Sequence, residues 1–69
     1  MRLRARNQLA GTAIEINEGA VTTTVKVRLV GGAIMTSSIT KEAADELGIE
    51  EGKAVTVVVK ASDVLLAVD

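Results

Sequence analysis

Apolar and polar residues alternate along most of the chain, a pattern typical of half-buried β-strands. The clearest run is Val21–Leu29, where the odd positions hold aliphatic residues and Thr23, and the even positions hold two threonines, Lys26 and Arg28. Because β-branched side chains fit a pleated surface better than a helix, this run predicts a strand. The same alternation predicts four further strands: Gly11–Ile16, Ala33–Ile39, Ala54–Lys60 and Val64–Val68. The stretch Met1–Leu9 either extends the first strand or reaches a neighbouring subunit.

One segment breaks the alternation and has the marks of a short helix. Thr40 is a good N-cap, Glu42 lies in the first turn, where the helix dipole favours a carboxylate, and Gly48 is placed to end the helix. A two-turn helix is therefore predicted over Lys41–Leu47. Five short strands with one helix between the third and the fourth is the arrangement of an OB-type barrel. The expected fold is all-β with one short helix, as a single domain over residues 1–69.

Composition limits how such a barrel can be stabilised. The chain has 69 residues, 48% of them hydrophobic and none aromatic. A domain of this length with short aliphatic side chains buries little area, and such domains usually need additional stabilisation. The absence of cysteine excludes disulfides, and the absence of both cysteine and histidine argues against a stabilising zinc cluster. Oligomerisation remains, so we expect subunits that share strands or a core.

Composition and charge also argue against several classes of function. The chain lacks the commonest general base, histidine, and the best thiol nucleophile, cysteine, so we expect no catalytic residues and no enzyme. A net charge of -1 and the absence of aromatic side chains argue against a nucleic-acid partner. No apolar run is long enough to span a membrane and no signal-peptide pattern is visible, so the expected location is the cytoplasm.

The first candidate binding cluster is a row of arginines near the N-terminus. Arg2, Arg4 and Arg6 alternate with Leu3 and Ala5, so on a strand their guanidinium groups would share one face. Such an array donates hydrogen bonds to an anion. The alternative is an edge strand whose charges oppose aggregation, and the cluster taken alone favours this alternative.

The second candidate is the motif Lys60-Ala61-Ser62-Asp63, at a break between two predicted strands. A bend there can direct consecutive backbone N–H groups into one concavity, with the Ser62 hydroxyl and the Lys60 ammonium as further donors. The alternative is a turn in which Ser62 or Asp63 caps its own backbone, and the motif taken alone favours it.

The third candidate is the turn Glu18-Gly19-Ala20-Val21-Thr22, which leads into the longest predicted strand. Its small residues would let a ligand or another backbone approach closely. An ordinary hairpin turn explains the same residues equally well. The acidic residues around the helix are interpreted as a solvated face, with no paired-carboxylate geometry implied: Glu42, Asp45, Glu46, Glu50 and Glu51.

Two longer motifs carry a resemblance to a known family. The runs Ala5-Arg6-Asn7-Gln8-Leu9 and Lys60-Ala61-Ser62-Asp63-Val64, with Gly11 after the first and Gly31-Gly32 between them, resemble the molbindins. These are small, free-standing molybdate-binding proteins of TOBE/Mop type, and the resemblance covers essentially the whole chain. It implies an OB-like barrel, a homohexamer built as a trimer of dimers, and oxyanion binding at subunit interfaces without covalent chemistry or a cofactor.

The resemblance also implies two oxyanion sites. The first combines one segment of one subunit with a second segment of another: Arg4, Ala5, Arg6, Lys60, Ala61 and Ser62. The second uses backbone donors of the turn before the long strand: Ala20, Val21 and Thr22. The chain departs from the family at Arg4, where the family has a serine. The larger cationic side chain either tightens binding or fills the pocket.

The chemistry of the ligand agrees with these donors. Molybdate and tungstate are fully deprotonated dianions near neutral pH, so they accept hydrogen bonds and donate none. Lys60, Ser62 and the arginines are suitable donors, whereas the Asp63 carboxylate should point away. The expected function is storage or buffering of molybdate or tungstate. The alternative is a structural assembly module with a degenerate oxyanion site, which Arg4 keeps open.

Overall fold

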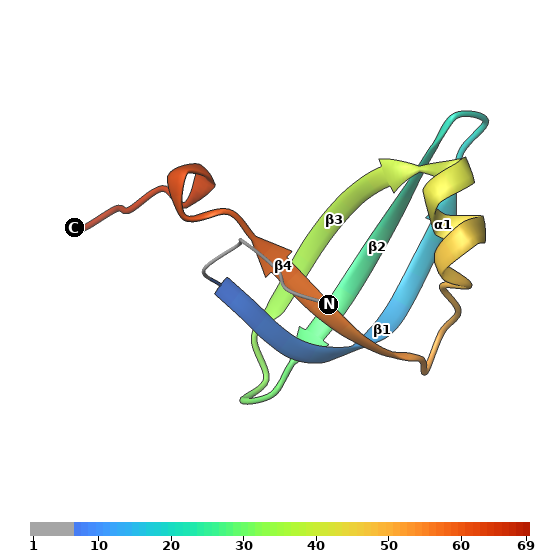
Figure 1. The fold of residues 1–69 in the computed structure, drawn as a ribbon. Coiled ribbons are helices and arrows are strands. Elements are labelled where there is room, and N and C mark those ends of the chain that lie inside the picture. Colours follow the sequence, from blue (N-terminus) through green and yellow to red (C-terminus); the bar gives the residue numbers. More distant parts are fainter. Residues whose placement is uncertain (1–6) are drawn as a thin grey trace.

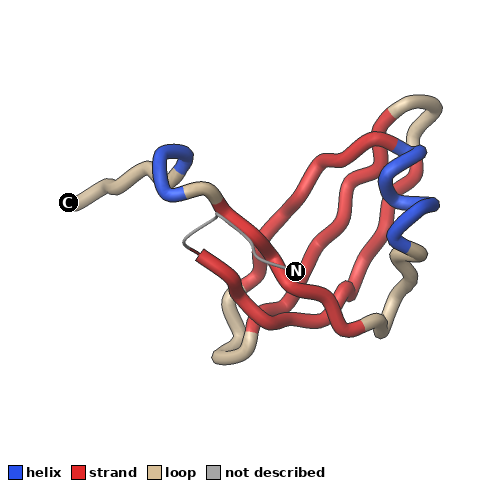
Figure 2. Tube along the Cα trace, viewed as in Figure 1, coloured by secondary structure: helices blue, strands red, loops and turns tan. Residues whose placement is uncertain are grey.

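The structure is a computed structural model, and it describes residues 7–69 of the chain. Four strands form one curled antiparallel sheet in the order β3-β2-β1-β4 (Figure 1). Helix α1 connects β3 to β4, and the 3-10 turn η1 follows β4 (Figure 2). The bounds of these elements are β1 (Asn7–Glu18), β2 (Thr22–Leu29), β3 (Ile34–Thr40), α1 (Lys41–Leu47), β4 (Ala54–Val59) and η1 (Ala61–Asp63).

Strand β1 belongs to both halves of the sheet. It pairs with β4 over residues 7–12 and with β2 over residues 11–18. Gly11 lies where the two pairings overlap. A Cβ atom at this position would lie 2.6 Å from Val27 Cγ1 and 2.8 Å from the Arg28 carbonyl oxygen. The close approach of β1 and β2 therefore requires glycine here.

A register shift between Ala13 and Glu15 bends β1 against β2. Before the shift Ala13 pairs with Val27 of the core, and after it Ile16 pairs with Val25. An extra residue in one strand increases the local twist, so this bulge contributes to the curl of β1 in Figure 1. The simple alternation over residues 11–16 did not predict it.

The core lies on the concave face of the sheet and is small. Ala13, Val25 and Val27 are buried there. Partly buried aliphatic side chains pack against them: Ile16, Leu29, Ile39, Ile49, Val55 and Val57. Thr23 is only 1% exposed, and its Oγ1 atom has no hydrogen-bond partner in the part of the chain that the structure describes.

The predicted helix is confirmed with the predicted bounds. Thr40 Oγ1 accepts a hydrogen bond from the Ala43 N–H at 3.0 Å, which caps the first turn. Gly48 ends the helix in the left-handed conformation, with φ 64°. The turn that contains Gly31-Gly32 joins β2 to β3.

The expected fifth strand over Val64–Val68 is wrong for this protomer. Beyond η1 these residues lead away from the sheet and pair with no strand in residues 7–69 (Figure 1). Their apolar side chains are exposed, by 92% at Leu65 and Leu66 and by 97% at Val68. A strand forms only where a neighbour accepts and donates its backbone hydrogen bonds. The fold is therefore a four-stranded, OB-like curled sheet with one short helix, whose edges β3 and β4 are not joined within the described protomer.

Candidate functional site

The C-terminal candidate residues lie just beyond the end of β4. Lys60 follows the last residue of that strand, and Ala61 and Ser62 open η1. All three are exposed. Among residues 7–69, neither the Lys60 ammonium nor the Ser62 hydroxyl makes a hydrogen bond or ion pair. Since no partner within residues 7–69 occupies them, both groups are available to an acceptor from outside this part of the chain.

The backbone of the same segment offers further donors. In η1 the Asp63 N–H donates to the Lys60 carbonyl at 2.9 Å, and the Val64 N–H donates to the Ala61 carbonyl at 3.3 Å. The N–H groups of Ala61 and Ser62 make no backbone hydrogen bond within residues 7–69, as is usual where a helical turn begins. Among residues 7–69 no side chain caps η1, so this part of the chain does not contain the self-capping turn that the sequence left open.

The N-terminal candidate residues Arg4, Ala5 and Arg6 lie outside the described residues. The chain that follows them is fixed beside the C-terminal motif. Asn7 pairs with Val59, and the Asn7 side-chain amide donates to the Val59 carbonyl at 3.2 Å. The start of β1 and the end of β4 are thus neighbours at one end of the sheet.

The candidates in the first turn lie at the opposite end of β1. Ala20 and Val21 form the turn, and Thr22 begins β2. The Gly19 N–H donates to the Thr22 carbonyl at 2.8 Å, and the Lys41 N–H donates to the Val21 carbonyl at 2.9 Å, which ties the turn to α1. Ala20 and Val21 are exposed, and their N–H groups make no backbone hydrogen bond within residues 7–69.

The structure does not bring the two candidate sites together in one protomer. They are separated by β1, whose 12 residues rise by about 3.3 Å each. One small anion bound in this protomer cannot contact both segments. Two separate sites, as the resemblance implies, are compatible with this geometry.

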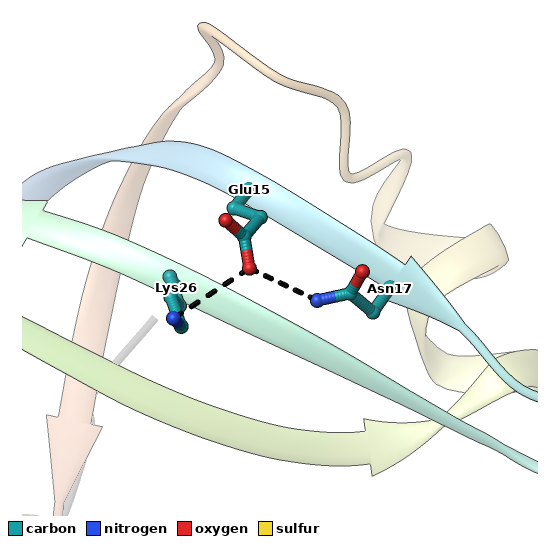
Figure 3. A network of polar contacts seen from close by, with 3 residues as sticks. All are labelled: Glu15, Asn17 and Lys26. Atoms are coloured by element: carbon teal, nitrogen blue, oxygen red, sulfur yellow. Dashed lines mark hydrogen bonds and ion pairs between the residues drawn. The ribbon is translucent and has the colours of Figure 1, made fainter.

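A polar network on β1 and β2 contains a lysine that, unlike Lys60, is paired with a carboxylate (Figure 3). Lys26 Nζ lies 3.6 Å from Glu15 Oε2, which also accepts a hydrogen bond from Asn17 Nδ2 at 3.0 Å. The two charged side chains are 45% and 49% exposed, so the pair stabilises the fold only slightly. Because a carboxylate offsets the Lys26 charge, this lysine is a poorer anion donor than Lys60.

The concave face holds an apolar hollow that sequence reasoning missed. Its volume is about 320 Å³, and it is lined by β2, β3, β4, the end of α1 and Ile49. The aliphatic part of its lining includes Val25, Val27, Ile39, Ile49, Val55 and Val57. A hollow of this kind suits an apolar group and not a dianion. The sequence shows the aliphatic residues, but it does not show that the two edge strands of the sheet, β3 and β4, stay apart.

Neither a metal centre nor a membrane-spanning helix is found in the described part of the chain. Within residues 7–69, no three histidine, cysteine, aspartate or glutamate side chains are grouped so that they could hold a metal ion. None of the helices in the same range has the length and apolar character needed to cross a membrane.

Comparison with known proteins identifies the family. The TOBE domain model matches residues 4–66. Over 66 residues the chain is 41% identical to molybdenum-pterin-binding protein 2 of Clostridium pasteurianum, and the match covers 96% of this chain and 97% of that protein. The relative is named for binding and not for catalysis.

Solved structures have the same fold along the chain. MopII from Clostridium pasteurianum superposes with a TM-score of 0.92 at 39% identity, covering 97% of this chain and 100% of that one. The cytoplasmic molybdate-binding protein ModG, solved with molybdate bound, superposes with a TM-score of 0.96 at 48% identity. That match covers 100% of this chain and 49% of ModG. By sequence and by fold, the chain belongs to the TOBE domain family and is of the Mop type.

Proposed function

We propose that this protein binds molybdate or tungstate as a free dianion and stores or buffers it in the cytoplasm, without catalysis and without a cofactor. The observation that carries the proposal is the similarity over nearly the whole length of both chains to a molybdenum-pterin-binding protein. The fold of the molybdate-bound ModG structure, which this chain matches at 48% identity, supports it.

In the proposed first site, Arg4, Ala5 and Arg6 of one subunit face the 60–62 segment of another. The exposed Lys60 and Ser62 side chains support this assignment, because they can donate hydrogen bonds to a tetrahedral dianion. The backbone N–H groups that open η1 add donors without adding charge. The proposed second site uses the backbone of Ala20, Val21 and Thr22.

The proposed assembly is a homohexamer, built as a trimer of dimers, whose subunits share strands. Two features of the protomer support shared strands. The residues beyond η1 expose aliphatic side chains by 46% at Val64 and 92% at Leu65 and Leu66. The apolar hollow between β3 and β4 has a lining that matches such side chains. We call the residues beyond η1, 64–69, the tail. In the proposed assembly, the tail of one subunit covers the hollow of its partner as a fifth strand.

Titration with four anions tests the binding proposal. Isothermal titration with molybdate, tungstate, sulfate and phosphate, in parallel with thermal melting, should give binding and a raised Tm for molybdate and tungstate. A ligand present at 100 times its Kd stabilises the folded state by about 2.7 kcal/mol. Phosphate should bind more weakly, because its monoprotonated form carries a donor for which a donor-only site has no acceptor.

The same titration decides for or against the alternative function. A structural assembly module with a degenerate site, as Arg4 suggests, would form the oligomer but give no heat and no rise in Tm with any of the four anions. That result would contradict the proposed function.

A further inference from the structure

The segment that carries the C-terminal ligand donors is also the pivot between the sheet and the apolar tail. Residues 60–63 connect Val59, the last residue of β4, to Val64, the first apolar residue of the tail. Upstream, β4 is paired with β1 along its whole length. Downstream, the tail leads away from the sheet (Figure 1). The backbone of residues 60–63 therefore sets the direction in which the tail leaves.

Few contacts hold this pivot in the described part of the protomer. Its backbone is closed by the hydrogen bonds from the Asp63 and Val64 N–H groups, at 2.9 and 3.3 Å. All four pivot residues are exposed, and no side chain of residues 7–69 caps the turn. Exposed backbone hydrogen bonds with little packing around them open more readily than those of a core strand. The pivot is thus the least supported part of the path from the sheet to the tail.

We propose that an oxyanion bound at Lys60–Ser62 locks this pivot and thereby slows the exchange of subunits between assemblies. The inference rests on the proposed oxyanion site and on the proposed sharing of tails. A dianion held at once by the Lys60 ammonium, the Ser62 hydroxyl and the neighbouring N–H groups restrains η1 in one conformation. A tail leaves its partner only when the pivot turns, so the ligand must dissociate first.

This order of events has a quantitative consequence. If only unliganded sites release their tails, the exchange rate falls by the factor 1 + [L]/Kd, which is about 100-fold at a ligand concentration of 100 times Kd. Above Kd, the rate is then inversely proportional to the molybdate concentration. A ligand bound away from the pivot, in the turn before β2, leaves the rate unchanged.

Exchange can be measured on the unmodified chain. Unlabelled and 15N-labelled protein are mixed, and native mass spectrometry follows the appearance of mixed oligomers at several molybdate concentrations. Calorimetry in the same buffer gives Kd. Lys60→Ala should lose the slowing by molybdate, whereas Lys41→Ala should keep it. Lys41 is a matched control because it is exposed and its ammonium makes no hydrogen bond or ion pair in residues 7–69.

Each outcome is decisive. Slowing by molybdate in the wild type and in Lys41→Ala, but not in Lys60→Ala, supports the inference. If calorimetry detects binding while the exchange rate stays constant, pivot locking is wrong and the binding proposal stands. If calorimetry detects no binding, the proposed function itself fails. A protein that remains monomeric at micromolar concentration contradicts the sharing of tails and this inference with it.

Discussion

The two ends of β4 are each flanked by a lysine, and the two lysines are held in opposite ways. Before the strand, Lys53 Nζ donates to the carbonyl oxygens of Leu47 at 2.8 Å and Gly48 at 3.1 Å. The Lys53 carbonyl also accepts a hydrogen bond from the Ala13 N–H at 2.9 Å. After the strand, the Lys60 ammonium has no such partner in the described part of the chain.

The difference separates a structural cation from one that can serve a ligand. The end of α1 presents carbonyl oxygens without helical partners and a partial negative charge, and Lys53 satisfies both. The Lys53 ammonium therefore already donates its hydrogen bonds within the protein. Lys60 follows a strand, which has only a small net dipole, and its donors face solvent. The same residue type thus has a role that depends on which backbone groups lie within reach.

The largest expected effect lies beyond the Lys60 end, in the tail. Leu65→Asp combined with Leu66→Asp should convert the oligomer to monomers in light scattering at micromolar concentration. Because successive side chains of a strand point to opposite faces, one of the two carboxylates would face the apolar hollow. Burying that charge costs several kcal/mol, which exceeds what a marginal assembly can lose. Val30→Asp is the control, since Val30 is 85% exposed but lies outside the tail. An oligomer that survives the double substitution would remove the tail from the proposed assembly.

The next effect tests the ligand role of Lys60. Lys60→Ala should weaken molybdate binding by about tenfold to a hundredfold, because a hydrogen bond to a charged group contributes on the order of 1.5–3 kcal/mol. The Tm without ligand should stay the same or rise, since cations that converge at an empty interface repel one another. Calorimetry and melting on the same sample measure both quantities. Unchanged affinity would mean that Lys60 is an ordinary surface lysine.

The opposite pattern is expected at the other end of β4. Lys53→Ala should lower stability by about 0.5–1 kcal/mol, because it removes exposed contacts to the end of α1. In a domain of this size that corresponds to a Tm lower by roughly 2–8 °C. Molybdate affinity should not change. If Lys53→Ala weakened molybdate binding as much as Lys60→Ala, the distinction between the two lysines would be wrong.

Local signals predicted the parts of the fold that local contacts determine. Thr40 and Gly48 predicted both ends of α1, because a helix is capped by residues next to it in the sequence. The alternation over 21–29 predicted β2 nearly to the residue. The bulge after Ala13 and the tail were not predicted, since alternation describes one strand and says nothing of its partner.

The candidate site was predictable only in part for a related reason. Donor chemistry marked Lys60 and Ser62, but the same donors occur in ordinary turns, and the resemblance was needed to prefer them. Lys53 and Lys60 look alike in the sequence, because each lies at an end of the same predicted strand. Only the structure separates them, since the end of α1 comes within reach of Lys53 through the chain that folds back after it.

The smallest expected effect separates the contribution of the Ser62 hydroxyl to molybdate binding from that of the Lys60 charge. Ser62→Ala should weaken molybdate binding by about twofold to tenfold, because it removes one hydroxyl donor, worth about 0.5–1.5 kcal/mol, and no charge. The Tm without ligand should not change, since the Ser62 hydroxyl makes no hydrogen bond within residues 7–69. Ser62→Thr is the matched control, because it keeps the hydroxyl and should keep most of the affinity. Calorimetry with molybdate on the three proteins makes the comparison. A loss equal to that of Lys60→Ala would show that geometry matters as much as charge, and no loss would show that backbone N–H groups supply the tetrahedral contacts without the hydroxyl.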